Sequence, residues 1–206
     1  MPPSIVYPYL GNLYINLTNR CPVSCSFCVK SSWKLSYRGH DLRLRRDPQP
    51  SDVIEALGDI KKYRELVFCG FGESTYRLDE LKAVARAARE RGSPPIRLNT
   101  IGLANLIHQR DVVPELAGLV DTVSVSLNTA DPAQWRELHR PLKVYAERGF
   151  AAAQEFVKSS SRMLPRAVVT AVDLPGIDVA RLEDLAKDLG ASFRLRPRLA
   201  EAPETA

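Results

Sequence analysis

Residues 11–28 read GNLYINLTNRCPVSCSFC. In the first half of this segment, Asn12–Leu17, the apolar Leu13, Ile15 and Leu17 alternate with polar or aromatic neighbours, which is the pattern of a β-strand. The second half places Cys21, Cys25 and Cys28 in a loop that follows the strand at once. In parallel α/β folds, reactive groups gather where strands end. The segment therefore predicts a functional loop at the carboxyl end of a strand.

Beyond this segment, apolar runs rich in β-branched residues alternate with stretches of helical period, which indicates an α/β protein. Six parallel strands can form an open doubly wound sheet or an incomplete barrel, and spacing alone does not distinguish the two. The further strands are expected at 65–69, 95–100, 122–127, 166–172 and 192–195. Helices are expected at 51–63, with Ser51 or Asp52 as N-cap, and at 78–90, 112–119, 132–139, 142–158 and 179–189.

Length and composition favour one globular domain over residues 1–206. The chain has 206 residues, of which 45% are hydrophobic and 26% charged. We expect a core at 12–195, a basic loop at 30–50 and a short tail at 196–206. No apolar run is long enough to span a bilayer and the first residues lack a signal-peptide pattern, so we expect a cytoplasmic protein with no membrane partner.

The three clustered cysteines point to a metal rather than to disulfides, since one bridge among them would strand the third. Closely spaced cysteines of this kind hold iron-sulfur clusters. Zinc is the alternative, but it prefers four ligands and no paired Cys or His motif follows. Three thiolates leave one iron of a four-iron cubane open to a small molecule. The fourth cysteine, Cys69, is expected to be a small buried core residue.

The spacing of three and then two residues between the cysteines, with Phe27 just before the last, resembles the signature of the radical S-adenosylmethionine (SAM) superfamily. The wider run from Gly11 to Cys21 and the triplet Phe27-Cys28-Val29 resemble, more narrowly, the TatD-associated radical SAM proteins. The resemblance implies a partial (β/α)6 barrel with its cofactors at the strand carboxyl ends. It implies a [4Fe-4S] cluster on Cys21, Cys25 and Cys28, and bound SAM.

Residues that follow the later strands extend the resemblance to the SAM site. The turn Gly70-Phe71-Gly72-Glu73-Ser74 stands where the family has Gly-Gly-Glu-Pro, so Glu73 inherits the contact with the methionyl amino group. Phe71 between the glycines and Ser74 in place of proline depart from that pattern. A Gly-x-Gly-Glu turn taken alone is usually only a tight turn that needs the conformational freedom of glycine.

Other strand ends carry further candidates for binding SAM. Ser124, Ser126 and Asn128 resemble the positions that hold the SAM ribose and carboxylate, although solvent-facing side chains alternate in the same way. Asn99 and Thr100 end another strand and can reach cofactor or substrate. Val172 and Phe27 match positions beside the adenine; both can also be simple core residues.

The resemblance implies an enzyme that uses SAM to form a 5′-deoxyadenosyl radical, with a one-electron donor such as flavodoxin or ferredoxin as partner. The alternative is a non-catalytic iron-sulfur electron carrier or nucleic-acid sensor. The net charge is +5, and positive side chains are concentrated between Lys30 and Arg46. This stretch favours a nucleotide or nucleic-acid substrate, with a solvated loop as the plainer reading. Within it, Trp33 and Tyr37 can stack on a base or anchor the loop.

The remaining ionisable residues carry little signal. Arg196 and Arg198 can bind an anion, but solvent exposure is the plainer reading. His40, His108 and His139 are scattered along the chain and suggest only ordinary surface or helix roles.

Overall fold

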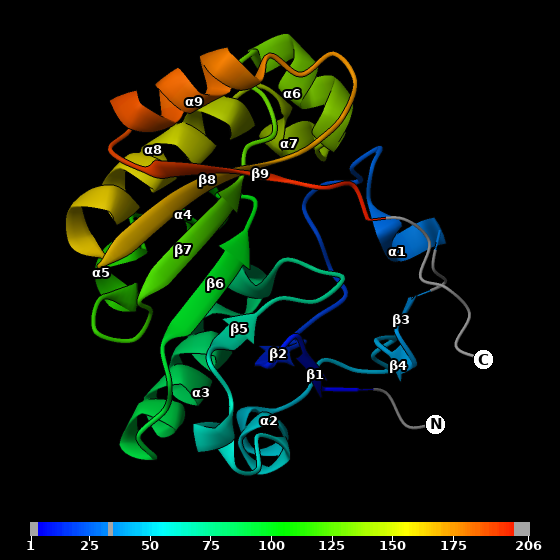
Figure 1. Ribbon diagram of the computed structural model, residues 1–206, viewed down its shortest axis with the longest axis vertical. Coiled ribbons are helices and arrows are strands. Elements are labelled where there is room, and N and C mark those ends of the chain that lie inside the picture. The colour runs from blue at the N-terminus through cyan, green and yellow to red at the C-terminus, as the bar shows by residue number, and fades with distance from the viewer. Residues whose placement is uncertain (1–3, 33–34, 200–206) are drawn as a thin grey trace. The chain divides into compact units, whose positions relative to one another are not determined.

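A computed structural model of the chain describes residues 4–32 and 35–199. They form two compact units (Figure 1). Among the described residues, the N-terminal unit comprises 4–21, 29–32, 35–98 and 199, and the C-terminal unit comprises Pro22–Cys28 and Asn99–Arg198. Strand β6 (Ile96–Thr100) starts in the first unit, and its last two residues belong to the second. That residues 1–206 act as a single domain stays a prediction.

The sheet of the N-terminal unit has the strand order β1 (Val6–Tyr9), β2 (Asn12–Ile15), β5 (Leu66–Phe68) and β6. Strands β2, β5 and β6 are parallel, whereas β1 pairs antiparallel with β2. Leu10 and Gly11 between them have φ of 46° and 75°, as a two-residue hairpin turn requires. The antiparallel β1 was not predicted, and it adds a seventh strand to the sheet beside the six that were expected.

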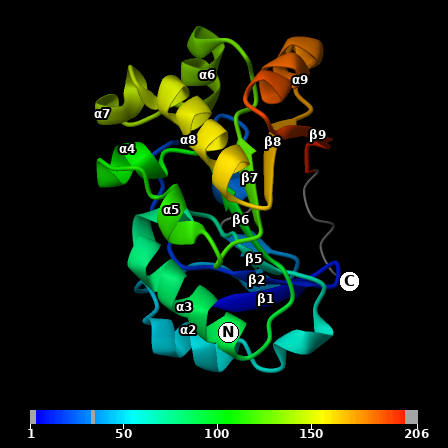
Figure 2. The same cartoon turned by 90° about the vertical axis from the view of Figure 1, so that its left-hand side faces the viewer.

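The helices of this unit cover a compact apolar core. Helix α3 (Leu78–Glu90) has the predicted bounds and buries Leu78, Leu81, Val84, Ala85 and Ala88, all on one face. Helix α2 (Pro50–Ala56) lies beside α3 (Figure 2). Smaller elements are α1 (Val29–Ser32), the hairpin β3 (Ser36–Tyr37) with β4 (His40–Asp41), and the 3-10 helices η1 (Ile60–Lys62) and η2 (Ser74–Arg77).

The predicted helix 51–63 is shorter and is capped differently. Gln49, not Ser51 or Asp52, is the N-cap of α2, and Asp52 closes a capping box from the third helical position. The helix ends at Ala56, two residues before Gly58, which has a left-handed φ of 57°. The rest of the predicted helix is the separate η1.

The C-terminal unit builds its sheet from β7 (Thr122–Ser126), β8 (Arg166–Val172) and β9 (Ser192–Arg196), all parallel and in this order. Helix α8 (Gly149–Met163) packs on β7 and β8 (Figure 2). The remaining helices are α4 (Ala104–His108), α5 (Val113–Leu116), α6 (Pro132–His139), α7 (Lys143–Ala146) and α9 (Val179–Asp188).

Within this unit β8 and α6 have the predicted bounds, but three other expectations need correction. The predicted helix 142–158 is two helices, α7 and α8, and α8 extends to Met163. The predicted helix 112–119 stops at Leu116, and α4 was missed. Strand β9 includes Arg196, so the tail begins after it. The α/β class with mostly parallel strands is confirmed. None of the helices in the described residues is long and apolar enough to cross a bilayer.

Candidate functional site

The cysteine segment 21–28 contains a turn at Cys25–Cys28, and none of its three cysteine residues is fully buried. Cys21 and Cys25 are half-buried, Cys28 is exposed, and none of them forms a disulfide bond. The N–H of Cys28 donates to the carbonyl of Cys25 at 3.1 Å, which closes the turn between the last two cysteines. Phe27 between them is half-buried. Cys25 and Cys28 therefore lie at the two ends of a closed turn rather than in a core.

Backbone hydrogen bonds fix this turn to the end of α6 within the C-terminal unit. Ser24 N–H donates to the carbonyl of His139 at 3.0 Å, and Ser26 N–H donates to that of Leu138 at 2.8 Å. Val23 forms an isolated antiparallel bridge with Pro141. The last carbonyls of a helix have no partner inside it, so the cysteine turn supplies the missing donors. The helix end and the turn therefore hold each other in place.

His139, the last residue of α6, places its ring against the cysteine turn. The side chain is fully buried, and its Nδ1 lies 3.3 Å from Cys25 Sγ. The ring stacks on Trp135 with the two centroids 4.9 Å apart, and it forms a T-shaped pair with Phe27 at a centroid distance of 5.6 Å. Burial lowers the pKa of His139 to about 4. The expectation of an ordinary role for this histidine was wrong, and no local pattern in the sequence links it to Cys25.

The Gly70–Ser74 turn follows β5 in the N-terminal unit and packs on the segment that leads to Cys21. A Cβ on Gly72 would collide with the carbonyl oxygen of Thr18, and one on Gly70 would collide with Asn16 Oδ1. Neither glycine has a positive φ, so close approach requires them, and the predicted need for conformational freedom was wrong. Glu73 N–H donates to the carbonyl of Arg20 at 2.8 Å, which joins the two segments.

The Glu73 side chain, 3% exposed, caps the short helix that follows it. Its Oε1 accepts hydrogen bonds from the backbone N–H and the hydroxyl of Thr75, at 3.1 and 2.8 Å. Ser74 beside it is also buried. The carboxylate is thus held at a defined position after β5 by the helix that it caps. Its contact with SAM stays a prediction.

Asn128, just after β7, uses both ends of its buried amide within the C-terminal unit. Its Oδ1 accepts from the Val172 N–H at 2.9 Å, while Nδ2 lies 3.2 Å from the Ser126 carbonyl and 3.2 Å from His139 Nε2. The backbone at Asn128 is left-handed, with φ of 63°, which asparagine tolerates better than most residues. Two predicted positions, Asn128 and Val172, are therefore joined directly, and Asn128 also reaches Cys25 through His139.

The other predicted strand-end residues have mixed surroundings. Ser124 is buried in β7, which removes the solvent-facing alternative for it. Ser126 is half-buried and accepts a hydrogen bond from Arg196 Nη2 at 3.2 Å, whereas Arg198 is exposed. Thr100 is buried and its hydroxyl accepts from Gly102 N–H at 3.0 Å; Asn99 is half-buried. Their contacts with SAM stay predictions.

Cys69 is half-buried, not a core residue as predicted, because β5 ends at Phe68 and Cys69 lies in the exit of the strand. In the residues that the structure describes, no three His, Cys, Asp or Glu side chains gather as ligands of one metal ion. A cubane makes a different demand, since each thiolate binds a separate iron.

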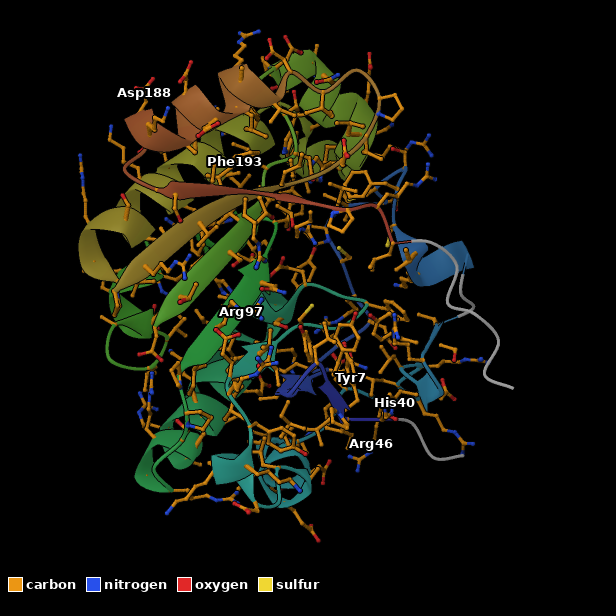
Figure 3. The ribbon with its side chains drawn as sticks, in the orientation of Figure 1. Tyr7, His40, Arg46, Arg97, Asp188 and Phe193 are labelled. Carbon is orange, nitrogen blue, oxygen red and sulfur yellow. The ribbon has the colours of Figure 1, made fainter. Side chains whose placement is uncertain are left out.

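Aromatic rings and carboxylates of the N-terminal unit contact several of the positive side chains in the basic stretch. The Arg38 guanidinium lies over the rings of Tyr9 and Tyr37, while Arg43 pairs with Asp41 at 3.9 Å and Arg46 with Asp52 at 3.4 Å. Tyr37 is buried and anchors the loop. His40 from the same hairpin packs against Tyr7 at 5.5 Å (Figure 3). Trp33 and Lys34 lie outside the described residues.

Comparison with known protein families identifies the family of the chain. The model of the radical SAM superfamily matches residues 15–189. The chain belongs to the radical SAM superfamily. The members of this superfamily are enzymes, and the family implies a [4Fe-4S] cluster and SAM as cofactors. The narrower TatD-associated subgroup stays a prediction.

Three solved structures of other proteins share the fold. SuiB of Streptococcus suis, bound to its precursor peptide SuiA, has a TM-score of 0.69 and 19% identity over 94% of this chain and 40% of its own. TsrM, a radical SAM methyltransferase of Kitasatospora setae solved with cobalamin and a [4Fe-4S] cluster, gives 0.57 and 15% over 90% and 36%. Methylornithine synthase, PylB, gives 0.54 and 15% over 91% and 53%.

These likenesses are likenesses of fold alone. They support the predicted α/β fold with a partial barrel. The chain spans about half or less of the length of each of these proteins. No curated protein matches the chain.

Proposed function

We propose that this chain binds one [4Fe-4S] cluster through Cys21, Cys25 and Cys28 and uses it to cleave SAM reductively. The cysteine segment supports this most directly: three partly exposed cysteines lie within eight residues, and backbone hydrogen bonds from Ser24 and Ser26 fix the segment to α6. Thiolates are the ligands that such clusters take, and three of them leave one iron for SAM. The donor set therefore fits the cofactor.

When bound, the cluster and SAM supply a one-electron cleavage that yields methionine and a 5′-deoxyadenosyl radical able to abstract hydrogen from a substrate. The chain's own residues bind and orient. Glu73, fixed by Thr75, offers a carboxylate to the methionyl ammonium. Gly70, Gly72 and Ser74 shape the same turn, and Ser124, Ser126, Asn128, Asn99, Val172 and Phe27 are the further proposed cofactor contacts. A flavodoxin or ferredoxin is the proposed electron donor.

The test is anaerobic reconstitution with iron and sulfide, followed by dithionite and SAM. We expect about four irons per chain and the formation of 5′-deoxyadenosine. The Cys25→Ala variant should lose the product because one iron loses its ligand. Cys69→Ala is the matched control, since it removes the one thiol outside the motif and should retain both cluster and product.

Each other outcome has a definite meaning. A bound cluster without 5′-deoxyadenosine would favour the electron carrier or sensor over the enzyme. Loss of product in Cys69→Ala but not in Cys25→Ala would mean that Cys69, and not Cys25, is a ligand of the cluster. Bound zinc or no metal after anaerobic handling would overturn the proposal.

For the substrate, we propose a nucleotide or another anionic molecule. Arg43, Arg45 and Arg46 are exposed beyond the cysteine segment, and the contacts of Arg43 and Arg46 with carboxylates are 3.9 and 3.4 Å long. Exposed pairs of this kind contribute little energy, so an anion can compete for these side chains. Nucleotide binding can be measured by adding ATP or a short single-stranded RNA at low salt.

A further inference from the structure

The buried His139 contacts the cysteine turn, and its two ring nitrogens have different partners. Nδ1 faces Cys25 Sγ at 3.3 Å, whereas Nε2 lies 3.2 Å from Asn128 Nδ2 and 3.3 Å from the Leu127 carbonyl. All of these residues belong to the C-terminal unit. A neutral imidazole has one donor and one acceptor nitrogen, and the hydrogen bond at one nitrogen selects the role of the other. The site can therefore hold either tautomer.

The orientation of the Asn128 amide is fixed by the backbone of β8. Oδ1 accepts from Val172 N–H at 2.9 Å, so the group that faces His139 is the amide nitrogen, which can only donate. A donor at Nε2 requires that Nε2 accept and that Nδ1 carry the proton. The competing tautomer places its proton on Nε2 toward the Leu127 carbonyl and suits a protonated Cys25, whose S–H can donate to Nδ1.

The protonation state of Cys25 determines which of these two tautomers forms. A thiolate that binds iron has no proton and can only accept a hydrogen bond. Only the Nδ1–H tautomer satisfies it, and Asn128 then donates to Nε2. The ring has little freedom to turn away, because it stacks on Trp135 and meets Phe27 at its edge.

We infer that His139 donates an Nδ1–H hydrogen bond to the Cys25 thiolate and thereby raises the reduction potential of the cluster, an inference that rests on the proposed cluster site. Reduction adds negative charge to the cluster and its sulfur ligands, and a donor aimed at a ligand sulfur stabilises that charge. His139 is a positioning residue, because it acts through Cys25. Asn128 and Val172 extend this series of hydrogen bonds from the Cys25 sulfur to the end of β8.

The experiment compares the midpoint potential of the reconstituted cluster in His139→Asn, His139→Gln and His139→Leu, followed by EPR. The asparagine amide nitrogen takes the place of Nδ1, so it keeps the donor to sulfur, whereas that of glutamine takes the place of Nε2 and loses it. We expect the ratio of reduced to oxidised cluster at a fixed potential to fall about tenfold in the Leu and Gln variants, which is about 59 mV for one electron. His139→Asn should stay near the wild type.

A purely structural role would give a different pattern, with Asn and Gln alike or with unchanged potentials in all three variants, and either result overturns the inference. Iron content is measured first, so a missing cluster in the wild type counts against the proposed function instead. Should the variants fold poorly, the wild type alone decides. With ¹⁵N-labelled histidine, pulsed EPR of the reduced cluster should show a coupled nitrogen from one of the three histidines. Absence of that coupling also overturns the inference.

Discussion

Glu73 combines a structural and a proposed binding task in one carboxylate. Its Oε1 accepts both hydrogen bonds from Thr75 and so caps the 3-10 helix η2. Capping needs only an acceptor oxygen, whereas attraction of an ammonium group needs the negative charge. A substitution that keeps the oxygen and removes the charge separates the two tasks.

Glu73→Gln is therefore expected to lower the affinity for SAM about tenfold or more, since hydrogen bonds to charged groups contribute about 1.5–3 kcal/mol. The free energy of unfolding should change by less than about 1 kcal/mol, because the amide oxygen can still cap. Calorimetric titration with SAM and urea unfolding measure the two effects. Asp59→Asn is the matched control: Asp59 caps η1 through Lys61 N–H in the same unit and should leave SAM affinity unchanged. Equal SAM affinity in Glu73→Gln and wild type would contradict the assignment.

At this scale, the sequence reveals residues whose partners are near in the chain. The cysteines stood out by their spacing, and the Gly-x-Gly-Glu turn by its resemblance to the family's motif. His139 was missed because its contact with Cys25 spans 114 residues and depends on where α6 ends. Cys69 was misplaced for a related reason, since one residue decides whether a side chain lies in β5 or in its exit.

Helix α6 owes its position to tight packing of Trp135 on the first turn of α8. Trp135 is fully buried, and a Cβ added to Gly149 would lie 2.6 Å from its Cη2. Only glycine lets α8 start so close to the indole ring. The same indole stacks on His139, so this contact also sets the position of that imidazole.

Gly149→Ala should lower the free energy of unfolding by about 1–3 kcal/mol, the usual cost of an overpacked core. Alanine is the better helix former, so propensity alone predicts the opposite sign. The double variant Gly149→Ala/Trp135→Phe should lose less than the sum of the single variants, because phenylalanine lacks the outer ring atoms that clash. Urea unfolding of the four proteins gives the coupling energy. Additive losses would show that the clash is relieved elsewhere.

Elements with clear end signals were predicted well. Helix α6 starts at Pro132 behind the cap Asp131, and β8 is rich in β-branched residues; both have the predicted bounds. The prediction of one helix at 142–158 was wrong because the apolar period continues through Arg148 and Gly149, where the structure starts a new helix. Strand β1 was missed although Leu10-Gly11 forms a hairpin turn, because Pro8 weakens the strand pattern; proline is tolerated there at the sheet edge.

On the scale of the whole molecule, the distribution of charge matters more than its sum. A net charge of +5 attracts any polyanion weakly, and salt screens that attraction within about 10 Å at 0.1 M. A specific anion site instead depends on where the cations lie. Two charge reversals change the net charge equally wherever they are made, so placement can be tested at constant net charge.

Arg43→Glu/Arg45→Glu and the control Arg162→Glu/Lys187→Glu both reduce the net charge from +5 to +1, since each reversal removes two units. Arg43 and Arg45 lie in the basic stretch; Arg162 and Lys187 are exposed on α8 and α9. Fluorescence anisotropy with a short single-stranded RNA should show at least a tenfold weaker affinity for the first variant only. Its salt slope should fall by about 0.7 for each lost phosphate contact. Equal weakening in both variants would show that the basic stretch acts only through its contribution to the net charge. No binding by the wild type would exclude this polyanion as a partner.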